Sequence, residues 1–588
     1  MVSRLFRDPV IREQIDYRST FFFCNRLIPD VIILGFIPYL TLYLLAWLLN
    51  IRLWLLRDLF WILHIGTGII VFRMVLRNRG QWELPHIIFW GLLLLAFLVP
   101  GAFLEYPTDV WAHLHRMSSF DPMLTVSESE TPWKFSYFWG WTFLSLVPMT
   151  LKRYFIDAYS TFWQMLLAIQ LYRFARALGQ NRSLSYLQVV GFFTLFGSNV
   201  FTFRYYALSS TALAYSVYLG ALVVCVGPSP QRGYLLLASA LLLMVFNHIQ
   251  EPLLLLINGG TIFFFWHALH LAPERRNRVV RYCGIFLIVL LIPAAFFGYF
   301  AKTEFFPFWR LRSFYLDTYG VHGAVSLVLA FIWRRKYPLL SALSLAPSLL
   351  LCYPPTAIIL HRLLGEYATF RVLYATPLSL FLVTCIYDLS KVALQAPVLS
   401  RYRWTASILA ILLMAIPARF PWRGRLYFQL YRAPHTLDLR GQEPTARWIH
   451  TNRSPSFSAG LFTDPLTAHA LTFYLGRAVG FPVAFQGHRL APEIFLWWQS
   501  PVFRGKDVWE FMQRHEIKRL LVVDRGLAPS PPDSRLRKLS EHWTHGTVGF
   551  DLSISPMLVQ TCDGLAQKWK WSKTPVPPFY YLYEPTDN

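Results

Sequence analysis

The sequence predicts a polytopic α-helical membrane protein with a C-terminal α/β domain. Of its 588 residues, 55% are hydrophobic and only 15% are charged, whereas a soluble domain has about 25% charged residues. Long apolar runs occupy residues 1–418, and ordinary polarity returns over 419–588. Aromatic residues make up 17% of the chain, which suits helices with rings at the lipid interfaces. A soluble globular enzyme, a disordered protein and a fibrous protein are thereby excluded.

The membrane part, residues 1–418, contains about thirteen stretches that could each span a bilayer, which takes roughly 20 apolar residues. Their expected limits are 31–49, 59–75, 86–104, 155–172, 184–200, 206–226, 234–246, 252–271, 282–300, 320–333, 338–352, 372–388 and 405–418. The net charge of +23 comes from basic residues spread between these stretches. We therefore expect no nucleic-acid partner.

A further apolar run at 135–151 is short, rich in aromatic residues and interrupted by Pro148. If this run lies along the outer surface, basic loops such as 275–281 and 334–336 face the cytoplasm, as the positive-inside rule requires. If it spans the membrane, those charges face outward. We therefore predict a surface-lying helix. The N-terminus is then cytoplasmic, and the long first outer loop, 105–154, and the C-terminal domain are both extracytoplasmic.

The C-terminal domain, residues 419–588, alternates strand-like and helix-like segments. Residues 457–464 and 517–526 have the composition of short strands, and residues 465–476 and 507–516 have the composition of helices. Such alternation implies at least one pair of parallel strands.

The first outer loop begins with LEYPTDVWAHLHRM, directly after the third apolar stretch. Asp109 and His113 are four residues apart, so on a helix they share one face; Glu105 comes one turn earlier. A carboxylate at the lip of a helix bundle is well placed to take a proton from an attacking hydroxyl. The alternative is that Asp109 caps the helix and the histidines lie among lipid headgroups. The acidic residues of this loop could also hold a divalent cation, Mg²⁺ or Mn²⁺, although no ligand spacing is diagnostic.

His248 and Glu251 stand at an outward turn between two apolar stretches and are three residues apart. Polar groups at membrane depth are costly, so they indicate a binding site or a water-filled cavity. The alternative is a hydrated turn that starts the next helix at Pro252.

Two later outer loops are rich in arginine. One has Arg310 and Arg312 among aromatic residues, and the other has His361, Arg362 and Arg371. Guanidinium groups suit phosphate binding, so these residues could hold a polyprenyl-phosphate headgroup. Binding of ordinary anionic lipid headgroups is the alternative.

The segments TDVWAHLHRM, FSYFWGWTFLSLV and FWQMLLAIQLYRFARALG follow one another in the order of an acidic outer helix, a surface helix and a span that ends in a basic inner loop. This order resembles the GT-C class of membrane glycosyltransferases, which includes oligosaccharyltransferases, protein O-mannosyltransferases and lipid A aminoarabinose transferases. RWIHTNRSPSFSAGLFTDP and VWEFMQRHEIKRLLVVD resemble the outer α/β domain of such chains. Two extra spans precede the loop, and the Asp-x-Asp pair of many relatives is absent.

The resemblance implies an inverting glycosyltransferase whose donor is a polyprenyl-phosphate-linked sugar. Asp109 matches the position of the catalytic acid of that class, and Glu105 is a candidate partner. The acceptor would be a glycan, lipid or protein on the outer face of a bacterial inner membrane, and no nucleotide is expected. A transporter or flippase of a lipid-linked saccharide and a polysaccharide polymerase remain as alternatives.

Overall fold

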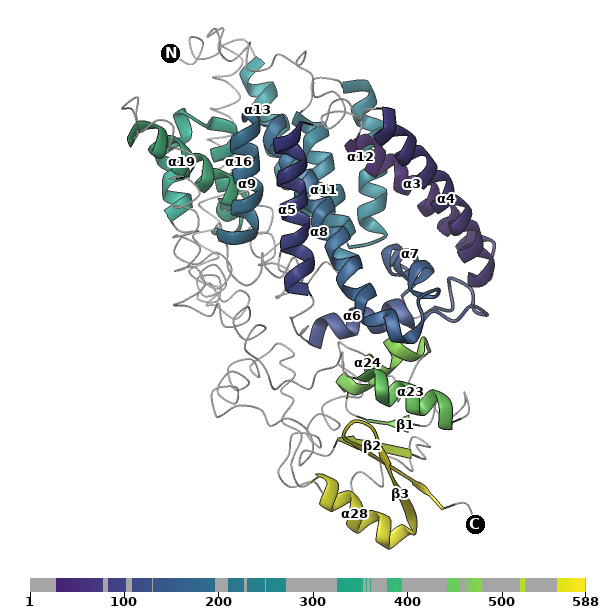
Figure 1. The fold of residues 1–588 in the computed structure, drawn as a ribbon. Helices are drawn as coiled ribbons and strands as arrows, with labels where there is room; N and C mark the ends of the chain where they lie inside the picture. Colours follow the sequence, from purple (N-terminus) through teal and green to yellow (C-terminus); the bar gives the residue numbers. More distant parts are fainter. Residues whose placement is uncertain are drawn as a thin grey trace, which may run out of the picture. The chain divides into compact units, whose positions relative to one another are not determined.

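The structure is a computed structural model that is mostly helical, with one small sheet near the C-terminus (Figure 1). It describes residues 28–77, 83–101, 108–129, 131–195, 210–226, 230–248, 250–270, 325–352, 356, 360, 378–393, 405, 442–453, 461–463, 465–477, 519–523 and 558–586. The chain divides into two compact units. The first comprises Met1–Leu42, Leu63–Leu95 and Phe162–Tyr427, and the second Tyr43–Ile62, Ala96–Thr161 and Phe428–Asn588.

The helices of the membrane part coincide with the expected apolar stretches. Helices with residues in both units are α3 (Ile28–Leu48), α4 (Leu53–Arg77), α5 (Leu84–Gly101) and α8 (Lys152–Ala177). Helices within the first unit are α9 (Arg182–Leu195), α11 (Ser210–Val226), α12 (Pro230–Val245), α13 (Gln250–His270), α16 (Pro338–Cys352) and α19 (Leu378–Ala393). The expected stretch 282–300 lies outside the described residues, as does 405–418 apart from residue 405. The total of thirteen spans therefore stays a prediction.

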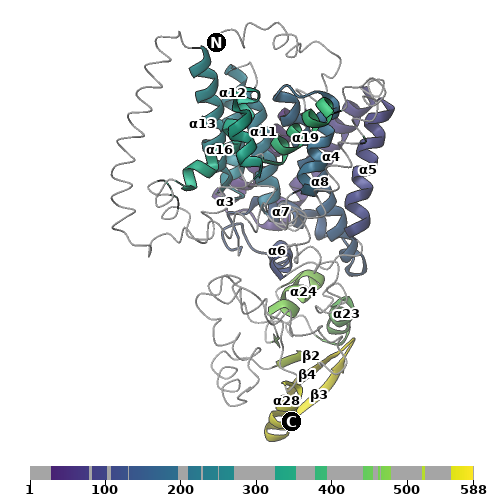
Figure 2. The ribbon, with the colours of Figure 1, turned by 90° about the vertical axis from the view of Figure 1, so that its left-hand side faces the viewer.

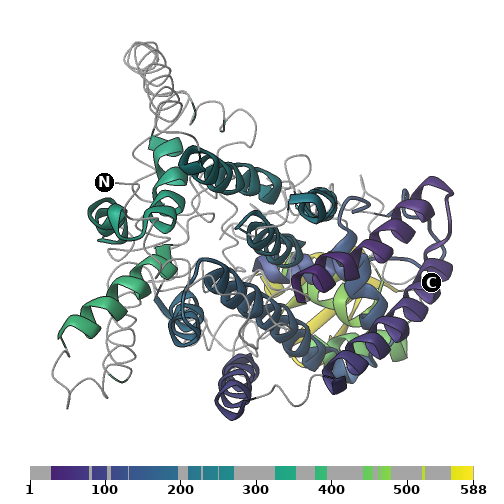
Figure 3. The same ribbon diagram turned by 90° about the horizontal axis from the view of Figure 1, so that it is seen from above.

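In the first unit, α11 packs against α12 and α13, α13 against α16, and α9 against α19. Figure 3 shows several of these helices nearly along their axes. Polar side chains link some of the pairs: Gln188 of α9 donates a hydrogen bond to Thr384 of α19 at 2.9 Å, and Asn258 of α13 donates one to Tyr218 of α11 at 2.8 Å.

The outer faces of α4 and α5 are apolar and exposed. Ile62, Phe72 and Leu92 are each more than 60% exposed, which is typical of helices that contact lipid rather than water. In the described part of the chain, one helical stretch, Leu53–Arg73, is both long and apolar enough to cross a membrane; the other apolar helices are shorter.

The second unit contains a four-stranded sheet in the order β1-β2-β4-β3. Its strands are β1 (Leu461–Phe462), β2 (Arg519–Val523), β3 (Trp571–Val576) and β4 (Tyr580–Pro585). β1 and β2 are parallel, as predicted, and β4 is antiparallel to both of its neighbours. The same unit contains α23 (Glu443–Asn452), α24 (Pro465–Leu475) and α28 (Leu558–Trp569), which Figure 2 shows with the sheet. The predicted helix at 465–476 is confirmed, whereas the predicted helix at 507–516 lies outside the described residues.

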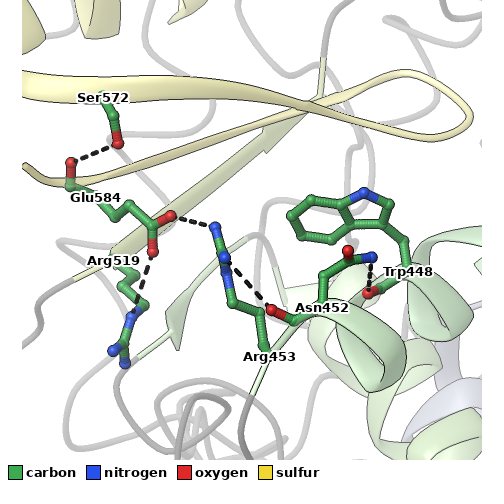
Figure 4. A network of polar contacts seen from close by, with 6 residues as sticks. All are labelled: Trp448, Asn452, Arg453, Arg519, Ser572 and Glu584. Carbon is green, nitrogen blue, oxygen red and sulfur yellow. Dashed lines mark hydrogen bonds and ion pairs between the residues drawn. The ribbon is translucent and has the colours of Figure 1, made fainter.

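A cluster of polar contacts joins α23 to the sheet (Figure 4). The Glu584 carboxylate on β4 pairs with Arg453, which follows α23, and lies 3.8 Å from Arg519 Nε on β2. The Arg453 guanidinium also lies 5.2 Å from the centre of the Trp448 ring. Because one carboxylate on β4 contacts arginines from two other segments, Glu584 fixes the helix against the strands.

Helix α7 (Phe135–Leu144) has 10 residues and is therefore only about 15 Å long, half of what a bilayer core requires. The prediction that this run does not span the membrane is thus confirmed. Its position along the outer membrane surface stays a prediction, and every α7 residue except Phe143 is buried within the protein. Its aromatic rings pack inward, for example Phe138 against Phe60 at 5.1 Å between ring centroids.

Candidate functional site

Helix α6 (Thr108–Ser118) carries the acidic segment of the first outer loop and packs between α7 and α24 within the second unit. His113 contacts α7, and His115 contacts α24. Residues two apart on a helix point in nearly opposite directions. The orientation of α6 is therefore fixed from both sides, and the face that contains positions 109 and 113 is fixed with it.

His113 is held by a buried phenol. Its Nδ1 lies 2.5 Å from the hydroxyl oxygen of Tyr137 on α7, and Tyr137 is 1% exposed. Asp109 is the second residue of α6, one turn before His113, and the positive end of the helix dipole favours an acidic residue there. The helix expected over positions 109 and 113 is present, and the predicted roles of Asp109 and His113 stay predictions.

On the other side of α6, the ring of His115 meets the ring of His469 edge to face, with 4.7 Å between the ring centroids. His469 is buried, and its Nδ1 has no hydrogen-bond partner in the described part of the chain. Burial, helped by the nearby His115 and Arg116, holds the pKa of His469 well below its ordinary value of 6.5. His469 is therefore neutral in the folded protein at neutral pH.

The same helix α24 is bound at its other end by Lys152, the first residue of α8. Lys152 Nζ donates hydrogen bonds to the carbonyl oxygens of Phe473 and Tyr474, both at 2.9 Å. A cation is favourable at a helix C-terminus, where carbonyl groups lack partners within the helix. Gly476 ends α24 with φ +69, a conformation that L side chains rarely adopt, and a Cβ atom there would lie 3.4 Å from Lys152 Nζ. Burial lowers the pKa of Lys152 to about 8.

Helices α6 and α7 approach each other closely at Gly140. A Cβ atom at this position would lie 2.8 Å from Met117 Sδ of α6 and 2.8 Å from the Tyr159 hydroxyl oxygen of α8. The absence of a side chain at Gly140 thus sets how closely α6 can pack.

The acidic residues of the first outer loop do not form a metal site in the described part of the chain, where no group of three or more potential ligands occurs. Asp121 Oδ1 accepts the backbone N–H of Met123 at 2.9 Å, and Glu128 accepts the backbone N–H and the hydroxyl of Thr125. Each of these two carboxylates therefore accepts hydrogen bonds from residues of its own turn. The side chains of Glu105, Asp109 and Glu130 are not described, and Mg²⁺ or Mn²⁺ stays a prediction.

The other predicted site residues divide into two groups. Those of the arginine-bearing loops lie outside the described residues: Arg310, Arg312, His361, Arg362 and Arg371. His248 and Glu251 are described and pair with each other in the first unit, at 2.6 Å between Nδ1 and Oε2. The predicted sharing of a face by these two residues is therefore confirmed.

Three residues of the α6 environment were not predicted to belong to a site: Tyr137, Lys152 and His469. Each reaches its partner through the fold, over separations that range from 24 residues for Tyr137 to 354 for His469. The one available sequence signal is the pair of cations, Lys152 and Arg153, between the apolar run 135–151 and the span expected at 155–172.

No protein-family model matches the chain, and no curated protein matches it in sequence. Among solved structures, the oligosaccharyltransferase AglB of Archaeoglobus fulgidus, in complex with an inhibitory peptide and a dolichol-phosphate, is 12% identical with a TM-score of 0.30; the match covers 87% of this chain and 75% of that one. An Archaeoglobus fulgidus oligosaccharyltransferase tethered with an acceptor peptide is 12% identical with a TM-score of 0.23, over 81% and 61% of the two chains. TM-scores this low do not establish a common fold.

Proposed function

We propose that this chain is a membrane glycosyltransferase that moves a sugar from a polyprenyl-phosphate donor to an acceptor on the extracytoplasmic face. The observation that supports this most is the placement of α6. Position 109, in the first turn of this helix, stands one turn before the half-buried His113, and the helix packs between α7 and the C-terminal domain. The GT-C-like order of segments and the exposed apolar faces of α4 and α5 agree with this proposal.

In the proposed reaction, the acceptor oxygen or nitrogen attacks C1 of the sugar, and the bond from C1 to the phosphate oxygen breaks. The electron pair leaves with the polyprenyl phosphate, and the acceptor proton goes to the Asp109 carboxylate, as in general-base catalysis. Attack opposite the leaving group inverts the configuration at C1. His113, fixed by Tyr137, would bind the acceptor or the sugar one turn from Asp109.

The arginine-bearing loops would hold the phosphate. Arg310, Arg312, Arg362 and Arg371 offer guanidinium groups, which stabilise the charge that develops on the departing phosphate. Glu105 would assist Asp109, and His361 would contact the headgroup. A polysaccharide polymerase would use the same donor and differs only in transferring to a growing glycan.

Transfer by the purified protein in lipid nanodiscs tests the proposal, with short-chain polyprenyl-phosphate sugars as donors and a soluble nucleotide sugar in a separate arm. We expect transfer from the lipid donor. Turnover with the nucleotide sugar alone, or translocation of the donor across the bilayer without transfer, contradicts the proposal.

The Asp109→Asn variant tests the role of the carboxylate. We expect transfer to fall by at least about 10²-fold with folding unchanged, because a general base contributes roughly 10²–10⁴-fold. A helix-capping role predicts almost no loss, since Asn and Asp cap about equally well. Asp121→Asn is the matched control, because Asn can still accept the backbone N–H of Met123. Normal transfer by Asp109→Asn with an inactive Glu105→Gln would assign the base to Glu105.

A further inference from the structure

The turn between α12 and α13, in the first unit, places an imidazole against a buried carboxylate. His248 Nδ1 lies 2.6 Å from Glu251 Oε2; the side chain of Glu251 is 2% exposed, and that of His248 is 18% exposed. Within the described part of the chain, this imidazole is the only hydrogen-bond partner of the carboxylate. One ring nitrogen is thus engaged by Glu251, and Nε2 is the atom left for another partner.

The geometry of this pair is fixed by the backbone on both sides. At the end of α12, the His248 N–H donates to the Met244 carbonyl at 2.7 Å, and the Asn247 side chain donates to the Leu243 carbonyl at 2.6 Å. Glu251 lies in the first turn of α13, where the helix dipole stabilises a negative charge. A carboxylate that holds Nδ1 of an imidazole orients the ring and leaves Nε2 to act on a hydroxyl group.

A role in stability alone does not explain this arrangement. A buried carboxylate with a polar partner contributes little net stability compared with apolar side chains of the same size. In addition, the neighbouring Gln250 is 3% exposed, and its Nε2 has no hydrogen-bond partner in the described part of the chain. Buried polar atoms without partners are rare in native structures and point to a missing ligand or water molecule.

The charges around the turn restrict the chemical class of the ligand. Residues 243–258 contain no lysine and no arginine, so this segment itself offers no cation for a phosphate. His248 Nε2 can accept a hydrogen bond, and the Gln250 amide can donate two. A hydroxyl group both donates and accepts, so a turn that offers both an acceptor and donors matches the hydroxyl groups of a sugar.

We propose that His248, Glu251 and Gln250 form a saccharide-binding site, in which Glu251 is a positioning residue for His248 and the His248 imidazole accepts a hydrogen bond from a sugar hydroxyl. The substrate class rests on the proposed glycosyl transfer. Two sources offer the same chemistry: the headgroup of the lipid-linked donor and a soluble acceptor glycan.

Carbethoxylation of histidine by diethylpyrocarbonate tests this site without any turnover, because an unprotonated ring nitrogen attacks a carbonyl carbon of the reagent. The protein in nanodiscs would be treated with reagent, and the modification of His248 followed by peptide mass spectrometry. Three arms contain short-chain polyprenyl-phosphate sugars, the same polyprenyl phosphate without sugar, or methyl glycosides. The exposed His450 of α23 serves as an internal reference whose modification should not change.

We expect sugar-bearing ligands to slow the modification of His248 by a factor of 1 + [L]/Kd, about tenfold at ten times Kd. Protection by the lipid-linked sugar identifies the donor as the source, and protection by methyl glycosides identifies the acceptor. Protection by bare polyprenyl phosphate to the same extent, or no protection by any sugar, overturns the proposal.

Two variants complete the test. Glu251→Gln removes the charge that orients the imidazole, and protection should then require about tenfold more ligand, a change of about 1.4 kcal/mol. Glu83→Gln, which alters an exposed ion pair of the same unit, should leave protection unchanged. Unchanged protection in a folded Glu251→Gln variant would contradict the positioning role of Glu251. Protection without sugar transfer would instead contradict only the proposed reaction.

Discussion

Lys152 Nζ donates hydrogen bonds to the carbonyl oxygens of Phe473 and Tyr474, so the first residue of α8 binds the end of a helix 322 residues further along the chain. Both bonds are buried, and both go to carbonyl groups in the last turn of α24, where a cation is favourable. This contact joins the end of the first outer loop to the C-terminal domain.

The Lys152→Met variant should loosen the C-terminal domain. Hydrogen bonds to a charged group contribute about 1.5–3 kcal/mol, and we expect the free energy of unfolding of the second unit to fall by about this amount. Pulse proteolysis of the protein in detergent, with release of the C-terminal domain as the readout, measures the change. Arg153→Met is the control, because that side chain is exposed and should shift the free energy by no more than about 0.5 kcal/mol. Equal resistance of both variants would show that Lys152 does not hold the domain.

Acid should weaken the contact between α6 and α24. The pKa of His469 is held below 6.5 in the folded protein, so below pH 6.5 the unfolded chain binds a proton that the folded chain does not. Stability is therefore lost as the pH falls from 6.5 towards the folded-state pKa, by up to about 1.4 kcal/mol per pH unit. Pulse proteolysis between pH 7.5 and 5 follows this loss.

His469→Leu should reduce that pH dependence, because it removes the titrating group and leaves an uncharged side chain at the buried position. His450→Leu, at an exposed position of α23, should retain the pH dependence of the wild type. A slope in His469→Leu as steep as that of the wild type would assign the acid sensitivity to another group.

Gly140→Ala should disturb α6. The new methyl group would lie 2.8 Å from Met117 Sδ and from the Tyr159 hydroxyl, and such overpacking costs about 1–3 kcal/mol. Because α6 must shift, sugar transfer should fall together with stability. Gly68→Ala in α4 is the matched control, since nothing lies within 4 Å of its new methyl group; Ala there should be neutral or stabilising. Wild-type stability and transfer in Gly140→Ala would mean that Met117 and Tyr159 can move aside without shifting α6.

The first outer loop and the C-terminal domain should lie on the same side of the membrane, because α6 and α24 are in contact within one unit. Single cysteines at Asp121 and Asp533, introduced one at a time, should both react with a membrane-impermeant maleimide in intact spheroplasts. A cysteine at Lys336, in a basic loop expected in the cytoplasm, should not react. Labelling of only one of the two outer positions would refute the topology.

The sequence predicted elements whose residues signal their structure locally. Parallel pairing of β1 and β2 followed from strand and helix alternation around Leu461 and Leu520. The hairpin of β3 and β4 was missed because Pro575, Pro577 and Pro578 break the pattern of a strand, while the pairing of β4 with β2 decides its place.

The residues of the candidate site also divide into those that local spacing predicts and those that only the packing of distant segments brings together. The shared face of Asp109 and His113 follows from their spacing of four residues. The partners Tyr137 and His469 could not be found in this way, because a spacing along the chain says nothing about which distant helix packs alongside. The burial of α7 was missed for a related reason: an aromatic-rich segment has the same composition at a lipid interface and in an aromatic core.

The contact of His115 with His469 also bears on how the protein is made. These residues are separated by 354 positions in the chain, so synthesis at about 5–20 residues per second leaves α6 without α24 for on the order of tens of seconds. During that interval the α6 surface that later meets α24 is open to proteases and to wrong partners. A chain that terminates before residue 465 never covers this surface, so nonsense mutations far downstream should cause degradation that begins in the first outer loop.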